Sequence, residues 1–172
     1  REEILIEFDK QIDFEDEKKF KRFIKRRSAK EPIAYILKHK EFWSKKFQIN
    51  NNILIPRPET ELLVEKLSNI YRDKNISILD IGTGSGCIII SLLSELQNSC
   101  GTGVDVSKKA IEVASMNAKK LIPNRRIKFL KKSFSNIFDQ KFDLIVSNPP
   151  YIKRCDIKNL NEDIKRFEPK IA

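Results

Sequence analysis

Four consecutive residues, Asn148-Pro149-Pro150-Tyr151, follow an apolar run at 142–147 that is typical of a buried strand. Two prolines cannot continue a central strand, because neither has a backbone N–H to give to the ladder. The strand therefore ends at Asn148, with a polar amide, a stiff backbone and an aromatic ring at its carboxyl end. Open α/β sheets bind their ligands there. An Asn side chain and a proline carbonyl can hold a planar –NH2 group beside the Tyr151 ring; the alternative is a strand that simply ends in a proline turn.

A glycine-rich segment lies where the first strand of the chain's second part passes into a helix. It consists of Asp80, Ile81, Gly82, Thr83, Gly84, Ser85 and Gly86. Glycines let the backbone approach a ligand closely, and the helix that follows presents free N–H groups. The spacing G-x-G-x-G differs from the G-x-G-x-x-G of dinucleotide-binding folds. The Asp80 carboxylate would repel a pyrophosphate, but it suits a ligand that bears a cationic amino group.

A second carboxylate, Asp105, ends the next strand, 19 residues after Gly86. Nucleoside-binding folds place a carboxylate on the ribose hydroxyls at this point. The alternative role for Asp105 is to cap the helix that begins at about Ser107. Ser107 can provide that cap itself, which leaves Asp105 for a ligand. Acidic residues at both strand ends, with no arginine nearby for phosphate, indicate S-adenosylmethionine.

The elements that position these residues alternate between strand and helix. We expect strands at 76–81, 100–106, 127–130 and 142–147, and helices at 86–96 and 108–120. The apolar runs of the strands are continuous, which indicates burial on both faces. The sequence therefore predicts an α/β fold with a doubly wound, mostly parallel, Rossmann-like sheet.

Residues before this sheet predict a small helical appendage and a hairpin. The spacing of Phe20, Phe23 and Ile24 predicts a helix from 14 to about 27, and 33–37 reads as a brief helix or turn. Alternation at 41–49 and at 53–55 predicts a β-hairpin that turns through residues 50–52. A further helix begins at Pro58 or Thr60, and we expect it to bury Leu62, Leu63 and Leu67.

Composition sets limits on the class of protein. A chain of 172 residues with 40% hydrophobic content can fold as one domain with a small appendage. No apolar run approaches the roughly 20 residues that span a bilayer. Three cysteines and one histidine argue against a disulfide framework and against a structural zinc site, and a reducing cytosol fits best. The net charge of +10 suggests an acidic partner such as nucleic acid, or only a composition rich in Lys, Asn and Ile.

The combination of 80–86, Asp105 and 148–151 resembles class I S-adenosylmethionine-dependent methyltransferases that act on planar amide or amino nitrogens. Further segments are similar to the HemK/PrmC family, which methylates the glutamine of the Gly-Gly-Gln motif in peptide chain release factors. These segments are Pro32–Ile36, Glu41–Trp43, Phe47, Leu54–Glu61 and Arg166–Pro169. The likeness covers about residues 20–172.

The resemblance implies a role for each candidate cofactor residue. It places Gly82–Gly86 around the methionine part of S-adenosylmethionine, Asp105 on the ribose and Phe134 beside the adenine. The family commonly has an acidic residue before that aromatic, to accept a hydrogen bond from the adenine amine. This chain has Ser133 there.

The resemblance also implies how the substrate is held. Asn148 and the Pro149 carbonyl would accept from the two N–H groups of the glutamine amide, and Pro150 and Tyr151 would wall the pocket. Arg57 would guide a release factor, or stabilise the domain junction through an ion pair with Glu59 or Glu61.

The expected organisation is a helical recognition unit with a hairpin at 1–50 and an incomplete methyltransferase domain at 51–172. We expect a complete domain to continue past Ala172 with strands that cover the edge of the fourth strand, which is otherwise an exposed apolar edge. Release factors are the expected partners of a cytoplasmic monomer. Two alternatives are a nucleic-acid amino methyltransferase, although no base-flipping element is evident, and a truncated, non-catalytic remnant.

Overall fold

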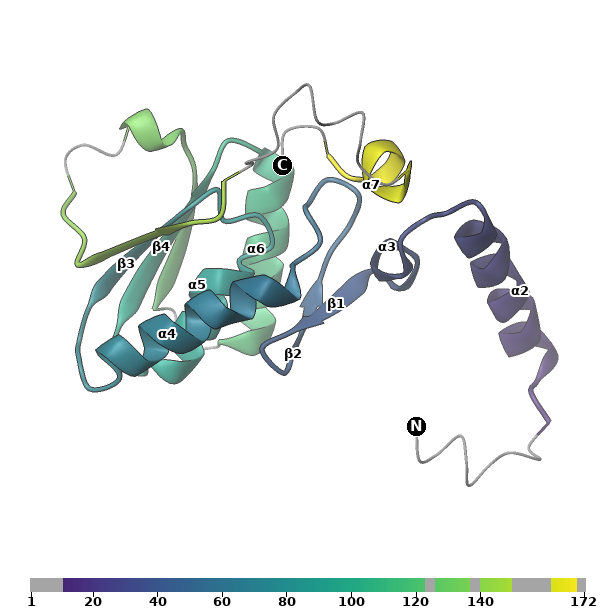
Figure 1. Cartoon of the computed structure of the whole chain (residues 1–172), viewed down its shortest axis with the longest axis horizontal. Helices are drawn as coiled ribbons and strands as arrows, with labels where there is room; N and C mark the ends of the chain where they lie inside the picture. Colours follow the sequence, from purple (N-terminus) through teal and green to yellow (C-terminus); the bar gives the residue numbers. More distant parts are fainter. Residues whose placement is uncertain (1–10, 123–125, 137–139, 150–161, 170–172) are drawn as a thin grey trace.

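The structure is a computed structural model that describes residues 11–122, 126–136, 140–149 and 162–169. An α/β unit forms one side of the molecule in Figure 1, and an antiparallel hairpin lies between this unit and the N-terminal helices. The helix α2 (Phe14–Ser28) lies farthest from the sheet.

Four parallel strands form the sheet of the α/β unit: β3 (Ser77–Ile81), β4 (Cys100–Asp105), β5 (Ile127–Lys131) and β6 (Leu144–Ser147). Their order across the described sheet is β5-β4-β3-β6. The chain moves outward from β3 to β5 and then returns to the other side of β3. This reversal is a topological switch point, outside which α/β folds bind ligands. The predicted parallel α/β sheet is confirmed, and each strand lies where the apolar runs placed it.

Three helices pack beside one another against this sheet: α4 (Glu61–Tyr71), α5 (Cys87–Glu95) and α6 (Lys108–Leu121). The central helix α5 is apolar on nearly all sides, and Ile89, Ile90 and Leu92 are fully buried. It approaches β4 closely because Gly101 has no side chain; a Cβ there would lie 2.7 Å from Cδ1 of Ile89. The predicted helices are confirmed, and they surround the main hydrophobic core.

The buried face of α4 differs from the prediction at one position. A 3-10 turn, η1 (Pro58–Thr60), leads into the helix, which begins at Glu61, one residue after Thr60. Leu63 and Leu67 pack against the core, but Leu62 is 60% exposed, so its predicted burial is wrong. Val64 is fully buried instead, because it lies on the same helical face as Leu67 and Ser68, three and four positions further along.

The hairpin turns at a different point from the one predicted. Its strands are β1 (His39–Phe42) and β2 (Lys45–Gln48), joined through Trp43 and Ser44 with φ of +50° and +52°. Residues 50–52 do form a turn, in which the N–H of Ile53 donates to the carbonyl of Asn50 (3.1 Å), but it follows the hairpin. The predicted strand at 53–55 is absent from the described elements.

The hairpin packs into the main core. Phe42 and Phe47 are 1% and 0% exposed, and both belong to the cluster formed by α5 and the sheet. Their rings meet edge to face, with centroids 6.1 Å apart. The hairpin therefore contributes side chains to the main core of the α/β unit.

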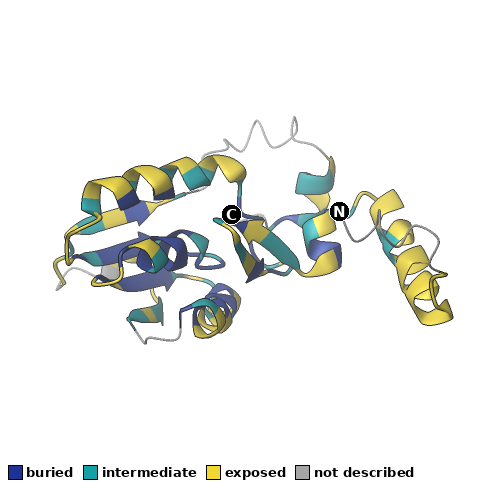
Figure 2. Ribbon diagram, turned by 90° about the horizontal axis from the view of Figure 1, so that it is seen from below, coloured by how far each residue is buried: buried dark blue, intermediate teal, exposed yellow. Residues whose placement is uncertain are grey.

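The N-terminal helices begin and end where predicted. Asp13 caps α2 by accepting from the N–H of Asp16 (2.8 Å), and the short α3 (Ile33–Leu37) follows. No residue of α2 is buried, and Phe20 and Ile24 are 60% and 51% exposed (Figure 2). Neither these helices nor any other helix within the described ranges has the length and apolarity that crossing a bilayer requires.

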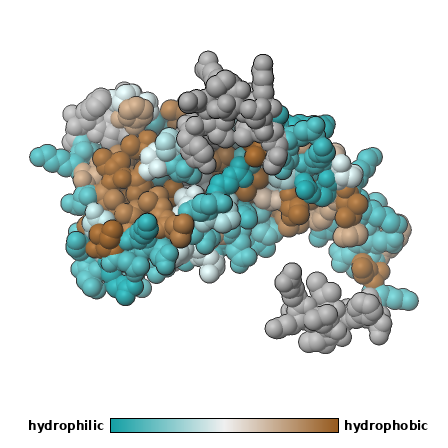
Figure 3. All heavy atoms as spheres, in the orientation of Figure 1, coloured by the Kyte–Doolittle hydropathy of each residue, from teal (hydrophilic) through white to brown (hydrophobic). Residues whose placement is uncertain are grey.

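Apolar side chains also gather over the sheet in the space-filling view (Figure 3). Within the described residues β6 is an edge strand, and its Ile145 is 59% exposed. This agrees with the expectation that the fourth strand presents an apolar edge.

Packing of the hairpin into the core predicts that Phe47→Ala lowers the free energy of unfolding by about 3–5 kcal/mol. The matched substitution Phe20→Ala, on the exposed face of α2, should change it by less than about 0.5 kcal/mol. Urea unfolding monitored by tryptophan fluorescence measures both. A similar small effect of the two substitutions would contradict the placement of the hairpin in the core.

Candidate functional site

A cavity of about 900 Å³ lies at the carboxyl ends of the strands, beside the switch point between β3 and β6. It is formed by the turn after the hairpin, the ends of β3, β4 and β6, the start of α6, the segment after β5 and the second residue after α7 (Glu162–Phe167). The lining residues are Asn51, Asn52, Ile53, Leu54, Ile81, Gly82, Gly84, Val104, Asp105, Val106, Ser107, Ala110, Lys132, Phe134, Ser147, Asn148, Pro149 and Pro169. The cavity thus brings together the glycine-rich segment, Asp105, Phe134 and the start of the Asn-Pro-Pro-Tyr motif.

The glycine-rich turn between β3 and α5 has a left-handed backbone at Gly82, Gly84 and Gly86, with φ of +71°, +55° and +78°. Residues with a Cβ rarely adopt these angles, which explains the alternate glycines. The N–H groups of Gly82 and Thr83 both donate to the carbonyl of Val104, at 2.9 and 3.0 Å, and so fix the turn to β4. Gly82 and Gly84 line the cavity, whereas Thr83 and Ser85 are buried behind the lining residues.

Asp105, at the end of β4, is held by two backbone N–H groups. Its Oδ2 accepts from Gly84 (3.0 Å) and its Oδ1 from Ser107 (2.9 Å). Ser107 caps α6 itself, because its hydroxyl accepts from the N–H of Ala110 (3.3 Å). The prediction that Ser107, and not the Asp105 carboxylate, caps α6 is thus confirmed. A carboxylate can accept about four hydrogen bonds, so the half-buried Asp105 retains acceptor capacity at the cavity wall.

Asp80 is 1% exposed and does not line the cavity. Its Oδ2 accepts from the hydroxyl of Thr83 (2.7 Å), while Oδ1 has no hydrogen-bond partner among the described residues. Burial raises the pKa of Asp80 to about 7, although the hydrogen bond from Thr83 opposes this shift. The carboxylate therefore organises the glycine-rich turn, and its predicted contact with a cationic ligand stays a prediction.

The Asn-Pro-Pro-Tyr motif begins at the cavity wall. Asn148 is half-buried, and both Asn148 and Pro149 line the cavity. The hydroxyl of Ser147 donates to the carbonyl of Ile81 (2.9 Å), which fixes the end of β6 to the end of β3. Pro150 and Tyr151 lie outside the described residues.

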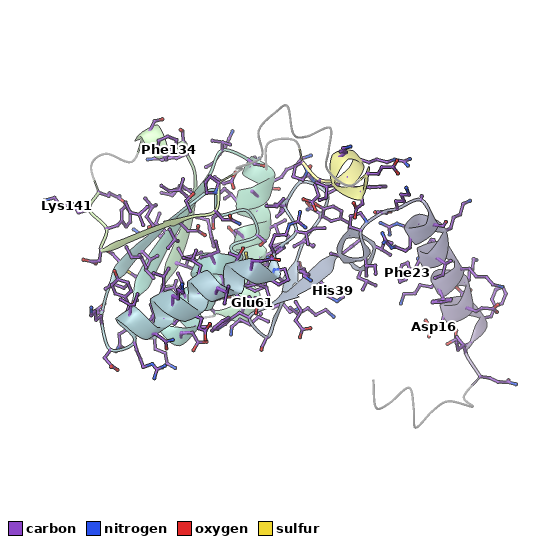
Figure 4. The ribbon with its side chains drawn as sticks, viewed as in Figure 1. Asp16, Phe23, His39, Glu61, Phe134 and Lys141 are labelled. Atoms are coloured by element: carbon purple, nitrogen blue, oxygen red, sulfur yellow. The ribbon has the colours of Figure 1, made fainter. Side chains whose placement is uncertain are left out.

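Phe134 belongs to η2 (Phe134–Asn136) (Figure 4), is 65% exposed and lines the cavity. Ser133, the residue before it, does not line the cavity, and its hydroxyl accepts from that of Ser135 (2.9 Å). Lys132 lines the cavity and donates its N–H to the carbonyl of Asp105 (3.1 Å).

Arg57 pairs with Glu168 rather than with Glu59 or Glu61, which corrects the predicted ion pair. Its Nη2 donates to both carboxylate oxygens at 2.8 Å. Glu61 instead accepts from the N–H of Trp43 (2.9 Å) beside the hairpin (Figure 4). The Glu168 side chain is 4% exposed, and burial raises its pKa, against the opposing charge of Arg57.

The Arg57–Glu168 pair joins two segments far apart in sequence at the cavity. The next residue, Pro169, lines the cavity, and Phe167 packs on Tyr35 and Ile55. Pro169 and Asn51–Leu54 are not among the residues that the sequence predicts for the site. The sequence predicts a hairpin turn and a strand for residues 51–54, and only the structure brings them to the sheet edge.

Within the described ranges, no three His, Cys, Asp or Glu side chains gather in a way that could hold a metal ion. A smaller cavity of about 400 Å³ lies at the opposite end of the strands, lined in part by Ser77, Cys100 and Arg126. The guanidinium of Arg126 is already used there, because its Nη atoms donate to the carbonyls of Leu93, Leu96 and Ser99.

Comparisons with known proteins agree with this geometry. The model of the methyltransferase small domain family matches residues 58–164, and that of the PrmC N-terminal domain matches residues 1–37. The chain therefore belongs to the methyltransferase small domain family, and its resemblance to the HemK/PrmC proteins is confirmed.

Curated relatives extend this result. A release factor glutamine methyltransferase of Buchnera aphidicola is 43% identical over 150 residues, 87% of this chain and 53% of the relative. One from Flavobacterium psychrophilum is 44% identical and covers 82% of this chain and 51% of the relative. A bifunctional methyltransferase of Rickettsia prowazekii is 38% identical over 99% of this chain and 37% of its own length. The chain thus spans about half the length of these relatives or less.

Solved structures support the fold. A SAM-dependent methyltransferase from Agrobacterium tumefaciens is 22% identical with a TM-score of 0.50, and covers 58% of this chain and 34% of that chain. A structure from Pyrococcus horikoshii has the same TM-score at 20% identity, and covers 68% of this chain and 56% of that chain. The fold is that of the class I methyltransferases.

The buried ion pair predicts that Arg57→Ala destabilises the protein by about 1–3 kcal/mol, because it leaves the Glu168 carboxylate buried and unpaired. We discount the larger values measured for deeply buried pairs, since the Arg57 side chain is 32% exposed. Lys21→Ala is the matched control, because Lys21 pairs with Glu17 on the exposed surface of α2. Urea unfolding measures both, and equal midpoints for the two variants would contradict a structural role for the pair.

The raised pKa of Asp80 predicts a pH-dependent stability. The folded state keeps the proton of Asp80 up to about pH 7, whereas the unfolded chain releases it near its ordinary pKa of 3.8. Stability therefore falls as the pH rises between these values, by on the order of 1 kcal/mol per pH unit, and is constant above them.

Asp80→Asn removes this contribution, because the amide does not titrate. The free energy of unfolding of Asp80→Asn minus that of the wild type should therefore increase from pH 4.5 to pH 7.5. Urea titrations at several pH values measure this difference. A difference that does not change with pH would contradict a raised pKa at Asp80.

Proposed function

We propose that the protein methylates the side-chain nitrogen of the glutamine in the Gly-Gly-Gln motif of peptide chain release factors, with S-adenosylmethionine as methyl donor. The observation that carries the proposal is identity of 43% and 44% to two release factor glutamine methyltransferases, over 87% and 82% of this chain. The match of residues 1–37 to the PrmC N-terminal domain supports the same substrate.

The described residues fit the cofactor. A cavity of about 900 Å³ agrees with the roughly 300–1,000 Å³ of small-molecule sites. Asp105, fixed by two N–H groups, has acceptor capacity left for the hydroxyls of a ribose. Gly82 and Gly84 leave the backbone open for the methionine part, and Phe134 offers an exposed ring to the adenine. When bound, the cofactor supplies an electrophilic methyl group on a sulfonium.

The adenine end of the site has one departure from the family pattern. Ser133 stands where an acidic residue would accept a hydrogen bond from the adenine amine, and its hydroxyl is already bonded to Ser135. We infer that stacking on Phe134 and the contact with Asp105 contribute most of the specificity for the nucleoside part.

The substrate amide would lie against Asn148 and Pro149. An amide nitrogen is a poor nucleophile because its lone pair is delocalised into the carbonyl. The side-chain oxygen of Asn148 and the carbonyl of Pro149 would accept from the two N–H groups, and so favour the charge that builds on nitrogen and orient it. Pro150 and Tyr151 would complete the wall.

This mechanism requires no protein nucleophile. Cys87, the residue after the glycine-rich segment, remains a thiol, because burial raises its pKa to about 12. Positioning and hydrogen bonding by Asn148 and Pro149 are therefore the main contributions of the chain to the reaction.

The proposal includes a division of labour within the chain. Residues 1–50 would recognise the release factor and residues 51–172 would carry the methyltransferase site. The burial of Phe42 and Phe47 in the main core attaches the hairpin, at the end of residues 1–50, to the methyltransferase domain. The engagement of Arg57 with Glu168 favours its structural role over contact with a release factor. Release factors act in the cytoplasm, where we expect the protein to be a monomer.

Transfer of tritium from labelled S-adenosylmethionine to a release factor tests the function. We expect labelling of a factor with Gly-Gly-Gln and none when that glutamine is replaced. Asn148→Ala should lower the rate by about 100-fold or more, because it removes one acceptor for the charged transition state. Asn98→Ala, at an exposed position before β4, is the control and should keep the wild-type rate.

Two outcomes would contradict the proposal. Equal labelling of nucleic acid and release factor would favour an amino methyltransferase for bases. Failure of a folded chain to label any release factor would favour a non-catalytic remnant.

A further inference from the structure

Asn117, in the middle of α6, is a polar residue with no exposed surface. Its side-chain oxygen accepts from the N–H of Gln48 (2.8 Å), and its side-chain nitrogen donates to the carbonyl of the same residue (3.0 Å). The amide thus pairs with the end of β2 as the backbone of a neighbouring strand would. Because its oxygen faces an N–H and its nitrogen faces carbonyls, the orientation of the amide is fixed.

The second hydrogen of the Asn117 amide reaches the cofactor side of the molecule. The side-chain nitrogen donates to the carbonyl of Ser85 at 2.9 Å. Ser85 is 3% exposed and lies between Gly84 and Gly86, whose φ angles are +55° and +78°. A carbonyl buried here without a donor would cost free energy, and other conformations of the glycine-rich turn would become more favourable.

The hairpin that Asn117 holds is also fixed at its other end. The N–H of Trp43 donates to Glu61 on α4, and its indole N–H donates to Glu95 on α5 (2.8 Å). Residues 51–54, separated from the end of β2 by two residues, line the cavity. The position of the hairpin therefore affects two walls of the cavity. It affects one wall through residues 51–54, which follow the hairpin, and another through the hydrogen bond between Asn117 and Ser85.

We propose that Asn117 is a positioning residue for cofactor binding. Its side chain links the conformation of the glycine-rich turn to the position of the hairpin. It acts through the Ser85 carbonyl and does not itself line the cavity. The inference rests on the proposed function, because the ligand of the turn is the cofactor of that reaction. A buried amide that bonds two segments of the site at once serves both packing and binding.

Calorimetric titration of the full chain with S-adenosylhomocysteine tests the effect on binding. Asn117→Ala should weaken the affinity by about tenfold or more, because the unsatisfied carbonyl of Ser85 disfavours the binding conformation. Ser115→Ala on the same helix is the matched control, because Ser115 is exposed and its hydroxyl donates to the carbonyl of Ile111. The control should bind as the wild type does.

Hydrogen exchange tests the link without ligand. In ligand-free Asn117→Ala, amides of residues 39–49 and 82–86 should both exchange faster than in the wild type, while amides of α4 should keep their wild-type rates. Faster exchange in only one segment would overturn the link, and so would a general increase across α4, which indicates only lost stability. If Asn117→Ala is insoluble, Asn117→Ser gives the same two readouts.

The two proposals fail in different ways. Absence of binding by the wild-type chain would count against the proposed function, and the exchange experiment would still decide the link. Wild-type binding with the same affinity in Asn117→Ala would overturn only the positioning role.

Discussion

The glycine-rich turn at Gly82–Gly86 has an internal hydrogen bond from the N–H of Gly86 to the carbonyl of Thr83 (2.8 Å), and the neighbouring elements supply further anchors. Three side chains from different elements hold it. Thr83 bonds to the buried Asp80 of β3, and the N–H of Gly84 bonds to Asp105 of β4. The carbonyl of Ser85 accepts from Asn117 of α6. Each anchor is fixed by the packing of the sheet and its helices, so the shape of the site depends on the whole core being formed.

Segments distant in sequence complete the cavity, and side-chain hydrogen bonds and ion pairs hold them as they hold the glycine-rich turn. The hydroxyl of Tyr35 donates to the carbonyl of Ile53 (2.7 Å), which holds the turn that lines one wall. Arg57 donates to both carboxylate oxygens of Glu168, and this pair holds the neighbouring Pro169 at another wall. Lys30 pairs with Glu162 at the other end of α7. Ile53, before the Asn-Pro-Pro-Tyr motif in sequence, and Glu162 and Glu168, after it, are thus each bonded to a residue nearer the N-terminus.

Local signals in the sequence predicted most of the fold and the start of the site. Continuous apolar runs located the strands, and Ser107 and Asp105 divided their roles as their neighbouring positions indicated. The predicted position of the hairpin turn was wrong. Trp43 and Ser44 adopt positive φ although neither is glycine or asparagine, whereas Asn50–Asn52 have the residue type that is typical of a turn. The pairing of Arg57 with Glu168 joins residues 111 positions apart, and a search among nearby acids could not find it. Asn117 had no local signal, since an asparagine inside an amphipathic helix is commonly exposed.

The net charge of +10 describes the surface better than it describes the site. The charged residues that line the cavity are Asp105 and Lys132 among those described, and a buried carboxylate, Asp80, lies close behind. Most lysines of α2 and α6 lie on exposed faces instead. A field of this kind raises the rate at which an acidic partner is encountered, and salt screens it. Inside the cavity, the carboxylate among the described lining residues is Asp105, and its charge is opposite in sign to that of the whole chain.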